Sequence, residues 1–172
     1  MTIVTPARVV LVFLGGLLAA CLETGLVAAV PGPLRFLPFV LAVGVYLTQS
    51  RSLPAGPWLI AGFGLFLDGF GLASVPFQTG AYALAAVAAA VSSRELFSNR
   101  SLSGLLGCGL LAWATHALVQ TAVWFVAGLD DPMQPPWGDY AWWLVWRLAL
   151  LSLSLAVLYY AVPRRTRLSM QR

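Results

Sequence analysis

Four ionisable residues interrupt otherwise apolar stretches of this 172-residue chain: Glu23, Asp68, His116 and Arg147. A charge within apolar sequence is costly, so such residues tend to pair, to face the interior of a helix bundle or to line a cavity. We expect Arg147 to pair with Asp68, with Glu23 nearby, in a polar cluster that opens as a shallow pocket or partner groove. Alternatively, Glu23 and Arg147 reach water and lipid headgroups unpaired, and His116 is a hydrogen-bonded packing residue.

The sequence contains none of the common catalytic or metal-binding motifs. GxSxG, HExxH, the Walker glycine loop and CxxC are all missing. Cys21 and Cys108 lie in apolar runs without metal-ligand spacing. No stretch has the repeated polar stripe that lines a water-filled pore, which argues against a channel. We therefore expect no catalytic residues, no cofactor and no metal site.

The composition is that of a membrane protein. Hydrophobic residues make up 60% of the chain and charged residues 9%, whereas a soluble domain carries roughly 25% charged residues. A membrane-spanning helix needs about 20 residues, which leaves no room for a second, soluble domain. We predict an all-α polytopic integral membrane helix bundle in which residues 1–172 form a single transmembrane domain.

Proline, glycine and polar residues divide the chain into apolar stretches. These cover about residues 9–30, 34–48, 57–70, 76–91, 102–127 and 142–162. Pro31-Gly32-Pro33 ends the first stretch because proline cannot continue a helix, and Pro57 and Pro76 suit helix starts. The pattern predicts six transmembrane helices.

The distribution of arginine predicts the orientation of these helices. The chain has no lysine, and its arginines would mostly be cytoplasmic if both termini are inside, as the positive-inside rule requires. This cytoplasmic set comprises Arg8, Arg51, Arg94, Arg100, Arg164, Arg165, Arg167 and Arg172. The outer connections would hold Arg35 and the acidic Asp130, Asp131 and Asp139. The arginines thus indicate topology rather than nucleic-acid binding.

The same orientation assigns a depth to the polar and aromatic residues. At about 1.5 Å per helical residue, the four ionisable residues fall in the outer half of the membrane. An aromatic belt would mark the outer interface; it comprises Trp137, Tyr140, Trp142, Trp143 and Trp146.

Small residues recur at four-residue spacing, which lets helices approach closely in lipid. The pairs are Gly15 with Ala19 and Gly16 with Ala20, and a third set is Ala81, Ala85 and Ala89. The spacing indicates internal packing or a partner helix, including one from a second copy of the chain.

Residues 18–21, which end at Cys21, resemble a bacterial lipoprotein cleavage box. The sequence after Cys21 stays largely apolar instead of becoming a polar tether. We therefore expect the first helix to be retained.

The third and fourth stretches predict a Gly-rich helix that ends in an Asp, followed by a Gly, Ser and Pro turn and a second apolar helix. The residues of this pattern are Gly62, Gly64, Asp68, Pro76 and Gly80. In these residues the chain resembles a segment of the bacterial rod-shape-determining MreD family. The turn after Asp68 is longer than the family pattern.

This resemblance implies a non-catalytic inner-membrane scaffold subunit for cell-shape determination and peptidoglycan elongation. Its implied partners are an MreC-like bitopic protein and other elongation proteins, and its implied fold is similar to substrate-binding components of energy-coupling-factor transporters. Residues 92–101 and 164–172 would then contact anionic lipid or an inner partner. The alternative is a vitamin-like small-molecule binding component, with Glu23, Asp68 and Arg147 lining the ligand pocket together with His116.

Overall fold

The computed structural model describes residues 14, 17–25, 29, 32–51, 53–72, 77–127 and 137–162, and this part of the chain is all-helical. Residues 17–25 are helical and are called the first segment below. The further elements are η1 (Pro33–Phe36), α2 (Phe39–Arg51), α3 (Ala55–Gly69), α4 (Gln78–Val91), the π-helical η2 (Ser92–Leu96), α5 (Leu102–Ala127) and α6 (Trp137–Ala161).

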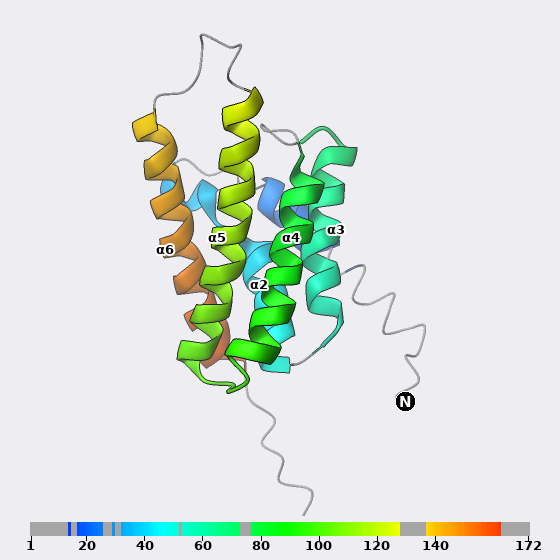
Figure 1. Cartoon of the computed structure of the whole chain (residues 1–172), viewed down its shortest axis with the longest axis vertical. Coiled ribbons are helices and arrows are strands. Elements are labelled where there is room, and N and C mark those ends of the chain that lie inside the picture. Colours follow the sequence, from blue (N-terminus) through cyan, green and yellow to red (C-terminus); the bar gives the residue numbers. More distant parts are fainter. Residues whose placement is uncertain are drawn as a thin grey trace, which may run out of the picture.

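Helices α2 to α6 form an antiparallel bundle (Figure 1). Helix α2 is central, since it packs against α3, α4, α5 and α6, while α3, α4 and α5 also pack in sequence order. Its side chains Val40, Leu41 and Val45 are fully buried. The hydrophobic core therefore forms around the short helix α2.

Two helices are long and apolar enough to cross a membrane, at Leu102–Val126 in α5 and Gly138–Ala161 in α6. Helices α2, α3 and α4 have 13, 15 and 14 residues, fewer than the roughly 20 that a span needs. The helical fold is as expected from the sequence, and the count of six spans stays a prediction.

The predicted helix boundaries differ from the structure near proline and polar residues. The expected stretch 102–127 coincides with α5. Helix α6 begins at Trp137, five residues before the expected start, because Asp139 in its first turn suits the helix dipole. The expected helix 34–48 is divided into η1 and α2 by Leu37 and Pro38, since proline lacks the amide hydrogen that a continuous helix requires.

Small residues let the helices approach closely inside the bundle. Ala81, Ala85 and Ala89 are fully buried on one face of α4, so this set serves internal packing. A Cβ at Gly56 of α3 would lie 2.6 Å from the Gly44 carbonyl oxygen of α2, which requires glycine at that crossing. Gly15 and Gly16 lie outside the described residues, whereas Ala19 and Ala20 are buried.

Candidate functional site

Arg147 of α6 forms the centre of a buried polar cluster. Its Nη2 lies 3.6 Å from Oε1 of Glu23 in the first segment and donates a 2.7 Å hydrogen bond to the Tyr82 hydroxyl of α4. The side chains of Arg147 and Glu23 are 14% and 8% exposed. A buried charge is tolerated when it is paired and hydrogen-bonded, so the first segment, α4 and α6 are tied together at this point.

The carboxylate of Glu23 also closes the amino end of α2. Its Oε2 accepts a 2.8 Å hydrogen bond from the backbone N–H of Val40. The first amides of a helix have no partner within that helix, and they carry a partial positive charge. Glu23 therefore contacts a guanidinium on one side and a helix amino terminus on the other.

The predicted pair between Asp68 and Arg147 is wrong, because both oxygens of Asp68 bind the start of α4. Oδ1 accepts from the Gln78 amide at 3.0 Å, and Oδ2 accepts from the Thr79 amide and hydroxyl, each at 2.7 Å. The N-cap residue Phe77 has a left-handed backbone (φ 68°) and forms no side-chain cap. Asp68 supplies the missing cap from the end of α3.

His116 packs against the cluster without joining its hydrogen bonds. Its ring lies 4.4 Å from the Tyr82 ring, and the residue is 2% exposed. One turn further along α5, Gln120 accepts a 3.1 Å hydrogen bond from Gln78. Nε2 of His116, Nε2 of Gln120 and Nε of Arg147 are buried and have no hydrogen-bond partner within the described part of the chain.

The structure thus brings together Glu23, His116 and Arg147 of the predicted cluster and leaves Asp68 out of it. Tyr82 is a further member that the sequence interpretation missed, and Gln78 and Gln120 form a buried hydrogen-bonded pair one helical turn away. Residue spacing could have indicated these residues. Gln120 follows His116 by four residues, and Gln78 precedes Tyr82 by four, so each pair lies on one face of its helix.

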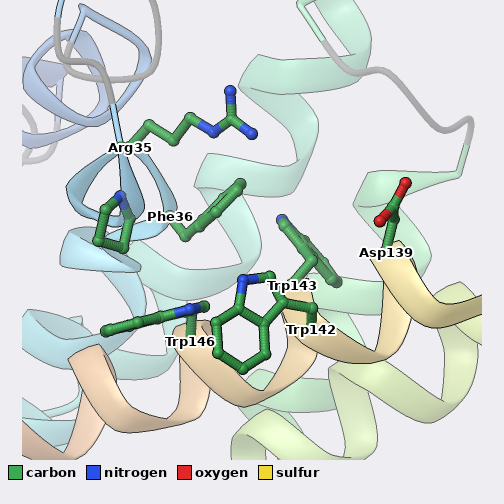
Figure 2. A pocket seen from close by; sticks show the side chains of 8 residues that line it. Arg35, Phe36, Asp139, Trp142, Trp143 and Trp146 are labelled. Atoms are coloured by element: carbon green, nitrogen blue, oxygen red, sulfur yellow. The ribbon is translucent and has the colours of Figure 1, made fainter.

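A second site is an open pocket of about 550 Å³ between η1 and the start of α6. Its lining includes aromatic rings and one charge of each sign (Figure 2); the side chains are Arg35, Phe36, Asp139, Trp142, Trp143 and Trp146. The Trp143 ring lies 5.0 Å from Cζ of Arg147. One indole ring therefore contacts both the pocket and the buried cluster.

The residues of the family resemblance lie largely at the joint between α3 and α4. A Cβ at Gly64 would lie 2.6 Å from the Gln78 carbonyl oxygen and 2.8 Å from Cβ of Tyr82. A Cβ at Gly80 would meet the Phe77 ring, whereas Gly62 has open space beside it. Pro76 lies outside the described residues.

The two sites differ in what they can do chemically. In the buried cluster, Arg147 is paired with Glu23 and hydrogen-bonded to Tyr82, and this arrangement fixes the first segment, α4 and α6 relative to one another. In the pocket, the charged groups are exposed and can bind a ligand. Comparison with family models, curated proteins and solved structures finds no match to this chain.

Proposed function

We propose that this chain is an inner-membrane protein with six spans and both termini in the cytoplasm. Large apolar side chains on the outward faces of the bundle support this proposal, since they would contact lipid; examples are Trp58, Leu65, Val87, Leu118 and Leu153, which are between 58% and 77% exposed. On a soluble protein, apolar patches of this extent are rare unless they bind a partner.

The charges at the two ends of the bundle support the same orientation. Arg94 and Arg100 lie in the connection between α4 and α5, at the end where α2 and α6 also finish (Figure 1). Asp139 lies at the opposite end, in the first turn of α6. This arrangement is the one that the positive-inside rule favours with Arg94 and Arg100 in the cytoplasm.

We further propose that the protein is a non-catalytic scaffold subunit for cell-shape determination and peptidoglycan elongation, which recruits an MreC-like protein. The observation that carries this proposal is that Gly64 and Asp68 serve one joint: Gly64 permits close approach of α4, and Asp68 caps it. These two residues of the resemblance thus have structural roles at the joint between α3 and α4, which supports a scaffold.

The partner surface would lie on outward helix faces instead of the polar cluster. The cluster is buried, and the alanine face of α4 is covered by its neighbours. On the other face of α4, Leu84, Val87 and Val91 are 50%, 58% and 51% exposed. They follow a helical spacing that a partner helix can pack against.

Photo-crosslinking in native membranes tests this proposal. A photoreactive residue at Val87 should capture an elongation protein, identified by mass spectrometry, whereas the same residue at the buried Ala85 should capture none. Capture of lipid alone from Leu84, Val87 and Val91 would contradict partner recruitment through this face. Loss of rod shape on depletion of the protein would provide independent support.

The pocket favours one alternative, a small-molecule binding component of a membrane transporter. Its volume of about 550 Å³ lies within the range of ligand sites, and its aromatic lining with few polar groups is typical of them. A thermal-shift screen of the purified protein against water-soluble vitamins would separate the two proposals. Stabilisation by one compound that Trp142→Ala abolishes would favour the transporter component.

A further inference from the structure

The pocket between η1 and α6 presents opposite charges on either side of an aromatic surface. In Figure 2, Arg35 and Asp139 lie at opposite sides of the view, with Phe36 and Trp143 between them. The two charged residues come from different elements, Arg35 from η1 and Asp139 from the first turn of α6. The site therefore has the features required to bind a ligand that carries both charges.

Neither charge is engaged by another charged group among the described residues. The ion pair in that part of the chain joins Glu23 and Arg147. Arg35 is exposed, and its Cζ lies 4.6 Å from the centre of the Phe36 ring, while Asp139 is exposed as well. Both groups are therefore available to a ligand at little desolvation cost.

The aromatic residues of α6 share a helix face with Asp139. Trp142, Trp143 and Trp146 follow it at three, four and seven residues, a spacing that places side chains on one side of a helix. The ring of Trp143 already contacts a cation, the Arg147 guanidinium. Trp142 is 60% exposed. Indole rings beside a carboxylate are the chemistry that recognises organic ammonium groups.

We propose that this pocket binds the headgroup of a zwitterionic phospholipid. Its phosphate contacts Arg35, since guanidinium groups match phosphate geometry, and its ammonium lies against the tryptophans beside Asp139. A lipid fits better than a free zwitterion because Leu34 of η1 and Val145 of α6 are 54% and 58% exposed. Leu34 and Val145 are next in sequence to the pocket residues Arg35 and Trp146, and their exposed apolar side chains can contact acyl chains.

Native mass spectrometry of the purified full chain tests this proposal. The protein is incubated with equimolar phosphatidylethanolamine and phosphatidylglycerol of identical acyl chains, and the lipids that remain bound are counted. The wild type should retain phosphatidylethanolamine in preference. Asp139→Asn, or Trp142→Leu as a second variant, should reduce this preference by roughly threefold to fivefold through loss of the ammonium contacts. Arg35→Gln should weaken binding of both lipids, because both carry a phosphate.

Glu95→Gln is the matched control, since Glu95 is an exposed carboxylate at the opposite end of the bundle. It should retain the wild-type preference, and circular dichroism should show that every variant keeps its helix content. Equal retention of the two lipids by the wild type would overturn the proposal. So would an unchanged preference in both Asp139→Asn and Trp142→Leu, or displacement of the lipid by an equal concentration of soluble glycerophosphoethanolamine.

Discussion

Glu23 and Asp68 perform the same task at two places in the bundle, where each carboxylate closes the amino end of a short helix. Glu23 accepts the Val40 amide of α2, and Asp68 accepts the Gln78 and Thr79 amides of α4. Their surroundings differ, because the Glu23 side chain is 8% exposed whereas Asp68 is an exposed residue.

The difference explains why only one of these caps has a cation. Burial of the Glu23 carboxylate removes its hydration, at a cost in free energy. The opposite charge of Arg147, 3.6 Å away, offsets this cost. Asp68 is exposed, and three hydrogen bonds from α4 satisfy its two carboxylate oxygens without a cation. Both carboxylates lie in apolar stretches of sequence, so the sequence does not distinguish them. They differ in exposure, and the buried one forms the ion pair with Arg147.

Removing the cation from the Glu23 cap should have the largest effect. Arg147→Met leaves the Glu23 carboxylate buried without its counter-charge, which costs about 3 to 5 kcal/mol of unfolding free energy. Unfolding of the purified protein by SDS titration in detergent micelles measures this loss. Glu23→Gln combined with Arg147→Met should cost less than the sum of the two single changes, since the two side chains are in contact.

The same measurement on the Asp68 cap provides the control. Asp68→Asn and Arg147→Met should be additive to within roughly 0.5 kcal/mol, because Asp68 binds α4 and shares no partner with Arg147. A coupling between these two positions as large as that between Glu23 and Arg147 would contradict the assignment of the ion pair.

Tyr82→Phe should have the next largest effect, because it removes a hydroxyl while preserving the ring. Arg147 loses an acceptor at 2.7 Å, and a hydrogen bond to a charged group is worth about 1.5 to 3 kcal/mol. The T-shaped contact of Tyr82 with Phe63 should persist. Tyr46→Phe, at another buried tyrosine, is the matched control. Equal losses in the two variants would show that Arg147 does not depend on the Tyr82 hydroxyl.

The helices could be predicted from the sequence wherever their ends coincide with a change from apolar to polar residues. Helix α5 is the clearest case, because polar residues 92–101 precede its apolar run. The start of α6 could not be predicted in this way, since Gly138, Asp139 and Tyr140 are polar or small and still form its first turn. Hydropathy detects the apolar part of a helix and misses turns that project beyond it.

The candidate site was predicted only in part, for a geometric reason. Counting residues gives the depth of Glu23, Asp68, His116 and Arg147 along their helices. It gives neither the rotation of each helix about its axis nor its neighbours, so the choice between Glu23 and Asp68 as the partner of Arg147 was undetermined. Tyr82 was missed because its side chain is neutral, and a hydroxyl costs far less to bury than a charge, so an apolar helix that contains tyrosine does not by itself predict a polar cluster.

Substitutions at two nearby glycines of α3 sharpen the description of the Asp68 joint. Gly64→Ala brings a methyl group within 3.0 Å of backbone atoms of α4, so the helices must separate, at a cost of about 1 to 3 kcal/mol. Gly62→Ala meets nothing within 4 Å and should stabilise α3 by up to about 1 kcal/mol through its higher helix propensity. SDS titration of both variants measures the difference. Equal effects would contradict the close contact between α3 and α4.

The smallest effect is expected at the exposed cap itself. Asp68→Ala removes the acceptor for the Gln78 and Thr79 amides and should cost about 1 kcal/mol, as is typical for the loss of a helix cap. Asp68→Asn keeps one acceptor oxygen and should recover most of that loss. Because neither change leaves a buried charge without its partner, neither approaches the cost of Arg147→Met. Hydrogen exchange at the Gln78 and Thr79 amides measures the effect locally: it should accelerate in Asp68→Ala, while the Val40 amide, held by Glu23, keeps its wild-type rate. Faster exchange at Val40 as well would mean that the two caps are coupled.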